Sequence, residues 1–110
     1  AALALCCSGE SVLHGAERLR HKESDRALTI KSEFEKLGGR VELNGDRMLI
    51  RGSKLHGGAI ESHGDHRIAM ACAIAALRSD SPVEINGAEC VSKSYSEFFD
   101  HMRRLGVDVR

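Results

Sequence analysis

The sequence predicts an α/β fold (α+β in some schemes), with helices packed on one another and on strands of mixed pairing. Two observations support this class. Segments with helical spacing of apolar residues alternate with short segments in which apolar and polar residues alternate, and glycines separate many of them. No low-complexity linker interrupts the 110 residues, a length that suits one small domain. We therefore expect residues 1–110 to form a single unit.

The N-terminal elements are short. Residues 1–7 are largely apolar and indicate the end of a buried helix that stops near Gly9, with Cys6 and Cys7 as small residues that fill the core. Residues 11–14 are typical of a short strand. Because the chain opens inside a helical pattern and without Met, we expect it to be part of a longer protein.

A long helix and a hairpin follow. From about residue 23 to residue 37 the apolar residues share one helical face, and Gly38-Gly39 forms the stop. Apolar residues then alternate with polar ones on both sides of Asn44-Gly45-Asp46. Asn and Gly tolerate the positive φ of tight turns, so residues 41–50 are predicted to be a β-hairpin.

The second half of the chain alternates strand and helix again. Residues 57–61 and 82–86 are predicted strands. Between them, residues 65–78 form a helix that is apolar on nearly every side and must be buried on most of its circumference. A final helix ends at Gly106, and Ser94 and Glu97 form a capping-box pattern at its start. Its apolar stripe consists of Tyr95, Phe98, Phe99, Met102 and Leu105.

Composition excludes several classes of partner. Sixteen basic and sixteen acidic residues balance to zero net charge, so bulk electrostatic binding to nucleic acid is not expected. The longest apolar stretch, residues 68–77, is too short to span a bilayer, so no membrane partner is expected. None of the four cysteines forms a C-x-x-C pair, which favours reduced thiols and a cytoplasmic protein.

Basic residues gather at the predicted helix starts. A helix N-terminus is the positive end of the helix dipole, so a cation there is normally unfavourable. Each such residue alone is most often a solvated surface charge, but all three long helices carry one or more. The pattern predicts that a multiply charged anion binds where the helix starts meet. The residues are Lys22 and Arg26 at the first long helix, His66 and Arg67 at the second, and Lys93 just before the third.

These side chains suit different tasks. Arg26 and Arg67 can each hold a carboxylate or a phosphate with a bidentate fork, and Lys22 and Lys93 can act as point charges on phosphate. Glu23 has two interpretations. It either suits the helix dipole as an acidic residue at the helix start, or it is a carboxyl held among cations that can pass a proton to a neighbouring carbon.

No metal site is expected. His63 and His66 are three residues apart, but Gly64 and the N-cap residue Asp65 between them argue against a shared helical face. The cysteines offer no paired spacing that would complete a zinc site. His63 is therefore expected to be an ordinary surface residue, whereas His66 lies beside Arg67 at a helix start.

Three segments resemble motifs of one enzyme family, the 5-enolpyruvylshikimate-3-phosphate synthases. RHKESDR at residues 20–26 looks like R-x-K-E-[ST]-D-R, GDHRIAM at residues 64–70 is similar to D-H-R-[MI]-A-M, and CVSKSY at residues 90–95 resembles C-x-x-K-[ST]-[YF]. Order and spacing agree, and the resemblance covers nearly the whole chain. The related transferase acting on UDP-N-acetylglucosamine shares the architecture but lacks the first two motifs in this form, so the shikimate enzyme is favoured.

The resemblance implies transfer of the enolpyruvyl group of phosphoenolpyruvate to the 5-hydroxyl of shikimate 3-phosphate, with release of phosphate. It implies a tetrahedral intermediate, no metal or organic cofactor, and two domains of repeated βαβαββ units with the substrates between them. By motif, Arg26, Arg67 and Lys93 would hold phosphoenolpyruvate, Lys22 would contact shikimate 3-phosphate, and Glu23 would transfer a proton at the methylene carbon. Lys22 is counted with Glu23 among the catalytic residues as well, and His66 joins the substrate-binding residues.

The sequence departs from the family in two ways. Ser96 stands where the family usually has Pro, and most of the family chain is absent, including the opposite domain and an Asp that acts as a base. We therefore expect a C-terminal fragment with half of the site, inactive alone. Its partners would be the two substrates and the remainder of the same enzyme chain, in a monomeric parent. The alternative is a free-standing anion-binding module without catalysis.

Overall fold

The computed structural model describes residues 1–110 and confirms the predicted α/β class. None of its helices combines the length and the apolar character that a membrane span requires. In chain order the elements are α1 (Ala2–Leu5), β1 (Glu10–His14), the 3-10 helix η1 (Ala16–His21), α2 (Arg26–Lys36), β2 (Arg40–Asn44), β3 (Arg47–Arg51), β4 (Gly58–Glu61), α3 (His66–Ala76), β5 (Val83–Asn86), the 3-10 helix η2 (Ala88–Lys93) and α4 (Phe98–Arg104).

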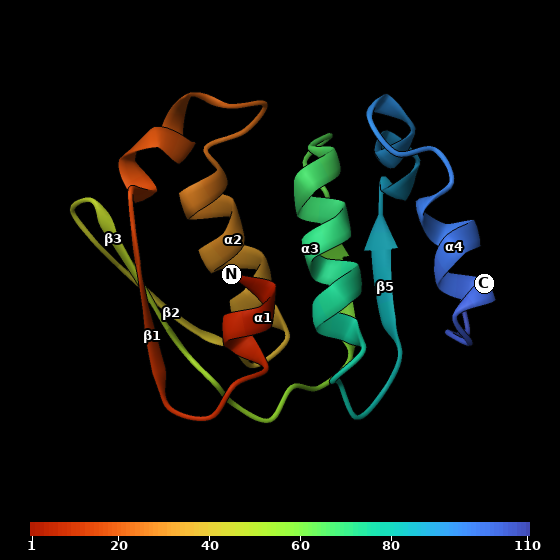
Figure 1. The fold of residues 1–110 in the computed structure, drawn as a ribbon, viewed down its shortest axis with the longest axis horizontal. Coiled ribbons are helices and arrows are strands. Elements are labelled where there is room, and N and C mark those ends of the chain that lie inside the picture. Colours follow the sequence, from red (N-terminus) through yellow and green to blue (C-terminus); the bar gives the residue numbers. More distant parts are fainter.

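The strands form two separate sheets. The first is antiparallel, with β3 between β1 and β2, and the second pairs β4 with β5 in parallel. Antiparallel and parallel pairing therefore both occur, as expected. Figure 1 shows the three-stranded sheet at one end of the molecule, β5 and α4 at the other, and α2 beside α3 between them.

The core consists of two clusters of buried side chains that meet at α3. The larger cluster joins both sheets to α1, α2 and α3, and includes the fully buried Leu5, Phe34 and Ile60. The smaller cluster joins α3 to η2 and α4 through residues such as Ala73 and Met102. Burial of α3 is less complete than predicted, because its last turn exposes 38% of Ile74 and its C-cap residue Leu77 is 51% exposed.

Both ends of helix α2 are set by capping interactions of neighbouring residues. Asp25 is the N-cap, and its carboxylate accepts from the Leu28 N–H at 3.3 Å, so the helix starts three residues later than predicted. At the other end, Gly38 has a φ of 89°, and the Gly39 N–H bonds to the Phe34 carbonyl at 2.9 Å. This is a Schellman motif and confirms the predicted stop.

The tip of the β2–β3 hairpin anchors the 3-10 helix η1, which the sequence pattern did not predict. Gly45 and Asp46 form the two-residue loop, and Gly45 supplies the positive φ of 59°. The Asp46 carbonyl accepts from the N–H groups of Gly15 and Ala16, both at 2.9 Å. Its carboxylate accepts from Gly15 and Glu17, both at 3.1 Å. These bonds fix the direction in which the chain enters residues 22–26.

The C-terminal helix differs from its prediction. It begins at Phe98 with Glu97 as N-cap and no side-chain cap bond, so the predicted capping box of Ser94 and Glu97 is wrong. The N–H groups of Ser94 and Tyr95 both bond to the Val91 carbonyl at the end of η2, which keeps this segment outside the helix. The predicted stripe shrinks accordingly: Phe98 and Met102 are buried and Phe99 is partly buried, whereas Tyr95 is 38% and Leu105 85% exposed.

The N-terminal helix is short, and only Leu5 is fully buried in it. The expectation that both cysteines fill the core is wrong, because Cys6 is half-buried and Cys7 is exposed. The chain then crosses the end of β3 at close range. A Cβ on Gly52 would lie 1.4 Å from the Cys7 carbonyl oxygen, so only glycine fits at this crossing.

Candidate active site

Residues 22–26 join η1 to α2 and carry three of the predicted site residues. Lys22 is the extended C-cap residue of η1 and is exposed, as is Glu23. The capping bond of Asp25 then sets Arg26 as the first residue of α2. The sequence thus presents Lys22 and Glu23 on an irregular segment and Arg26 on a rigid one.

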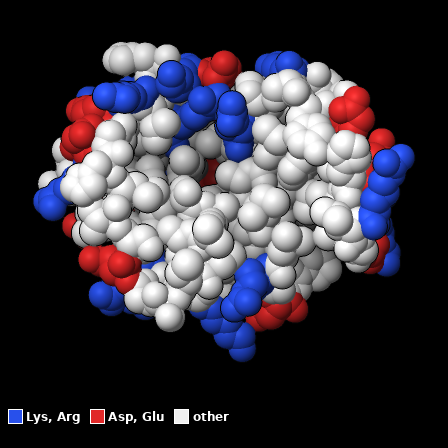
Figure 2. Space-filling view, viewed as in Figure 1, with Lys and Arg blue, Asp and Glu red and all other residues white.

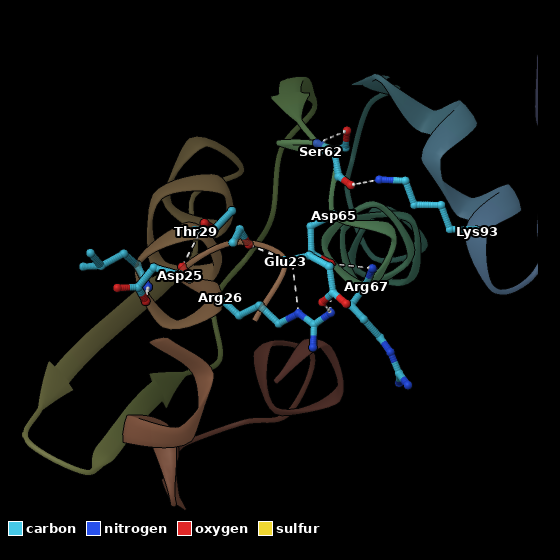
Figure 3. A network of polar contacts seen from close by, with 11 residues as sticks. Glu23, Asp25, Arg26, Thr29, Ser62, Asp65, Arg67 and Lys93 are labelled. Carbon is cyan, nitrogen blue, oxygen red and sulfur yellow. Dashed lines mark hydrogen bonds and ion pairs between the residues drawn. The ribbon is translucent and has the colours of Figure 1, made fainter. Parts of the chain in front are cut away.

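Arg26 connects this segment to the start of α3. Its Nε donates to one Asp65 carboxylate oxygen at 2.9 Å, and a terminal nitrogen donates to the other at 3.2 Å. The same terminal nitrogen also contacts the Glu23 carboxylate. Figure 3 shows the guanidinium of Arg26 directed at Asp65. The two motifs, 39 residues apart in the chain, are therefore held together by a bidentate ion pair.

Asp65 is fully buried and serves both sides of this connection. It is the N-cap of α3, as predicted, and its carboxylate accepts from the Arg67 N–H at 3.0 Å. It also accepts from the Ser24 hydroxyl at 2.7 Å. Burial alone would raise the pKa of Asp65, but the hydrogen bonds from Arg26, Ser24 and the Arg67 N–H outweigh it, so the pKa is lowered. The carboxylate is ionised at neutral pH.

Arg26 is more enclosed than a surface arginine. Its side chain is 14% exposed, and the hydrogen bond that it donates to Asp65 is the main reason that its pKa is raised. The sequence predicted Arg26 as a direct anion ligand. Here its guanidinium is paired with two carboxylates of the chain itself, so an incoming anion must share it with Glu23 or Asp65.

Glu23 lies among charges, as predicted, with its side chain half exposed. Its pKa is lowered, mainly by a bond to its own backbone N–H; burial opposes this, and the charge of Arg26 lowers the pKa further. The carboxylate is therefore ionised and ready to accept a proton rather than to donate one.

The start of α3 carries the next two predicted residues. Arg67 is exposed, and Figure 3 shows its side chain extending away from the helix start. His66 is half-buried, and its ring nitrogen Nδ1 is buried without a hydrogen-bond partner. Figure 2 shows basic side chains gathered around a hollow at the end of the molecule where α2 and α3 begin.

Lys93 lies near this region but is carried by a different element from the one predicted. It is the last residue of η2 and does not lie at the start of α4. Its Nζ donates to the Gly64 carbonyl at 2.9 Å, two residues before α3 begins (Figure 3). The prediction that three long helix starts carry cations is wrong for the third, but the Lys93 ammonium still lies beside the second.

The structure offers neither a cluster of metal ligands nor a reactive buried thiol. No three His, Cys, Asp or Glu side chains lie close enough together to hold a metal ion. Burial raises the pKa of Cys72 to about 12, so its thiol stays protonated. Two shallow surface pockets lie elsewhere, one beside β2 and β3 and one on the exposed side of α2. Both are lined mainly by charged side chains of mixed sign, and neither includes a predicted site residue.

Sequence reasoning missed two contributors. Asp65 was identified only as a helix cap, and Ser24 was given no role. A helix cap can be recognised from neighbouring residues. The pairing of Asp65 with Arg26, 39 residues away in the chain, has no signature in the spacing or periodicity of the sequence. The motif segments hinted at their proximity only through the cations that both contain.

Paired cationic segments lie at one end of an α/β unit, an arrangement whose charge suits anionic groups. The family profile described as EPSP synthase (3-phosphoshikimate 1-carboxyvinyltransferase) matches residues 1–102. The chain belongs to the EPSP synthase family.

Relatives agree in sequence and in structure. The 3-phosphoshikimate 1-carboxyvinyltransferase of Clostridium acetobutylicum is 50% identical over 108 residues, which is 97% of this chain and 25% of the relative. That of Methylococcus capsulatus is 46% identical over 96% of this chain and 24% of its own length. A solved EPSP synthase from Acinetobacter baumannii superposes with a TM-score of 0.92 at 36% identity, over 99% of this chain and 26% of that one. The chain thus spans about a quarter of the length of these relatives.

Proposed function

We propose that the chain is a C-terminal fragment of an enzyme that transfers the enolpyruvyl group of phosphoenolpyruvate to the 5-hydroxyl of shikimate 3-phosphate. The observation that carries this proposal is the ion pair between Arg26 and the buried Asp65. It joins the segment with Lys22 and Glu23 to the helix start with Arg67, and so concentrates cations and one proton-transfer group at a single end of the molecule.

Phosphoenolpyruvate carries a carboxylate and a phosphate, which need several donors. Arg67 is exposed and can hold one anionic group with a bidentate fork, while the Lys93 ammonium lies beside the α3 start as a second charge. Arg26 would join them by exchanging its contact with Glu23 for the substrate. Its two bonds to Asp65 meanwhile keep the guanidinium in place.

The remaining two binding residues flank this group. Lys22 is exposed at the end of η1 and would contact the phosphate of shikimate 3-phosphate as a point charge. His66 precedes Arg67 on the first turn of α3 and is half-buried, so it would contact a substrate held by Arg67.

Glu23 would move the proton. A proton added to the methylene carbon of phosphoenolpyruvate lets the 5-hydroxyl oxygen add to the neighbouring carbon, while the hydroxyl proton passes to the Asp base of the opposite domain, giving the tetrahedral intermediate. Loss of a methyl proton and of phosphate then restores the double bond. The lowered pKa of Glu23 suits removal of the proton. Its donation in the first step requires a higher pKa, which the negative charges of both substrates would provide.

The rest of the same enzyme chain would be the main partner. Figure 2 shows that the middle of one face, over α1 and α3, carries few charged side chains. Leu3 of α1 is 76% exposed, and Ile74 of α3 and its C-cap residue Leu77 are also exposed. Contiguous apolar patches on folded domains mark interaction sites. In this proposal the parent is a cytoplasmic monomer that needs no metal or organic cofactor.

A phosphate-release assay with both substrates tests the proposal. The full-length parent is expected to release phosphate, and the 110-residue chain is expected to release none, because the water-excluding opposite domain is missing. A parent that binds phosphoenolpyruvate without turnover would favour an anion-binding module. Turnover by the isolated chain that disappears in Glu23→Gln would mean that the site is already complete.

A further inference from the structure

Glu33 is a second buried carboxylate and lies outside the site described above. Its side chain is 1% exposed in the middle of α2. It follows Arg26 by seven residues, which is about two helical turns, so both side chains leave the same face of α2. That face contacts the chain leading into α3 at two levels, through Arg26 at Asp65 and through Glu33 before it.

Glu33 contacts the end of β4, the connection from β4 to α3, and neighbours in its own helix. One carboxylate oxygen accepts from the Glu61 N–H and from the Lys36 ammonium, both at 2.8 Å. The other lies 3.0 Å from Nε2 of His63. A buried carboxylate is tolerated only when it is paired and hydrogen-bonded, and these donors meet that condition. Since the acceptor is ionised, the His63 ring nitrogen must carry the proton.

The connection that Glu33 holds is strained. His63 has a φ of 56°, in the left-handed region that residues other than glycine rarely adopt. The loop is also held from the opposite side, where the Ser62 hydroxyl bonds to the Gly87 carbonyl at 3.0 Å and Lys93 bonds to Gly64 at 2.9 Å. Residues in such conformations persist when their surroundings fix them. Glu33 supplies that restraint from α2.

We propose that Glu33 is a positioning residue for the anion site at the start of α3, acting through the Glu61 N–H and the His63 ring. The proposal rests on the proposed function, because the residues it positions are those assigned to phosphoenolpyruvate. If the contact between His63 and Glu33 were purely structural, the His63 ring would be expected to cover the core. Its side chain is 44% exposed and covers little. The contact instead fixes the path of residues 62–65, and so the position of Arg67 at the start of α3.

Variants at His63 test this without emptying a buried site. His63→Gly removes the ring and relieves the backbone, because glycine accepts a positive φ freely. His63→Gln keeps an N–H donor at similar reach and leaves the backbone strain in place. Glu33→Gln is the direct variant, and Glu35→Gln is its control on the exposed side of the same helix, where Glu35 pairs with Lys31. Ile50→Val, in the core, controls for general loss of stability.

In the full-length parent, His63→Gly and Glu33→Gln are expected to raise the KM for phosphoenolpyruvate about three- to tenfold, with kcat within about twofold, since one charge-assisted bond that orients the site is lost. His63→Gln, Glu35→Gln and Ile50→Val should keep the wild-type KM. If His63→Gly matches wild type, or if Ile50→Val raises the KM equally, the positioning role is wrong.

Amide hydrogen exchange of residues 61–67 gives a readout that does not depend on turnover. Exchange there should be about tenfold faster in His63→Gly than in His63→Gln, because one restraining bond is missing. An inactive wild-type parent would reject the proposed function alone, and the exchange data would still decide whether Glu33 and His63 hold the loop. Equal exchange in the two variants would overturn the proposal.

Discussion

The carboxylate of Asp65 accepts hydrogen bonds from Ser24, Arg26 and the Arg67 N–H, and thereby serves as cap, ion-pair partner and connector at once. Its role as cap could be predicted, because an N-cap is a matter of neighbouring residues. Its pairing with Arg26 could not, because that contact depends on how α2 and α3 pack. The sequence could therefore nominate candidate site residues, while their mutual contacts depend on packing that it does not encode locally.

Replacing Asp65 should be costly to folding. Asp65→Ala removes the partner of a mostly buried guanidinium, and breaking such a pair typically costs about 3–5 kcal/mol. Urea unfolding of the purified chain would measure it. Asp100→Ala removes an exposed carboxylate paired with Arg103 and should change stability by less than about 1 kcal/mol. Similar losses in both variants would argue against a special role for the buried pair.

Glu23→Gln in the full-length parent should lower kcat. The amide keeps the shape of the side chain but cannot exchange a proton, and general acid–base groups contribute about a hundredfold to ten-thousandfold. Because a negative charge beside Arg26 is removed, the KM for the anionic substrates should stay the same or fall. Steady-state kinetics separate the two parameters. Near-wild-type kcat with a raised KM would assign Glu23 to binding alone.

Arg67→Ala should have the opposite signature. It removes an exposed charged fork without touching the capping bond, which uses the Arg67 backbone. Charge-assisted contacts are worth about 1.5–3 kcal/mol, so the apparent affinity for phosphoenolpyruvate should fall about tenfold to a hundredfold. Arg78→Ala, an exposed arginine just beyond the far end of α3, is the matched control and should have no effect. Equal effects of the two variants would mean that Arg67 acts only through the overall positive charge of the protein and makes no direct contact with the substrate.

At the level of elements, prediction succeeded where a signal is local. The stop of α2 at Gly38-Gly39 and the cap of α3 at Asp65 both depend on residues within one turn. Prediction failed after β5. There the N–H groups of Ser94 and Tyr95 bond to the Val91 carbonyl of η2, so α4 begins only at Phe98. The S-x-x-E pattern at residues 94–97 is present, but packing of Cys90 and Val91 against α3 competes with it and prevails.

The Schellman stop of α2 can be tested by adding one methyl group. Gly38→Ala forces alanine into a φ of 89°. Its Cβ would also lie 2.9 Å from the His56 ring, which is closer than van der Waals contact allows. A left-handed conformation costs a non-glycine residue about 1–2 kcal/mol, so the free energy of unfolding should fall by at least that amount. Gly58→Ala has an ordinary φ and room for the methyl group, with 3.7 Å to its nearest neighbour, and serves as the control.

For the molecule as a whole, Asp65 and Glu33 make stability depend on acid. Both pKa values are lowered on folding, so the folded chain binds fewer protons than the unfolded one. Their contribution is present above the unfolded values of about 4 and is lost as the pH falls through the lower folded values. The denaturant midpoint should therefore decrease between pH 5 and pH 3. The double variant Asp65→Asn, Glu33→Gln should lose most of that decrease, and an unchanged slope would place the dependence elsewhere.

The crossing at Gly52 has a consequence for anyone seeking the smallest piece of this chain that folds. The first nine residues look dispensable, since α1 has only four residues and Cys7 is exposed. Yet the backbone of Cys7 lies directly against Gly52, the Gly52 N–H bonds to the Gly9 carbonyl at 3.0 Å, and Leu5 is fully buried. Trimming to β1 would uncover the end of the central strand β3 and open the larger core. The practical boundary of a foldable unit therefore lies before Leu5, and a tag or reporter inserted at Gly52 would separate two stretches of backbone that have no room for a side chain between them.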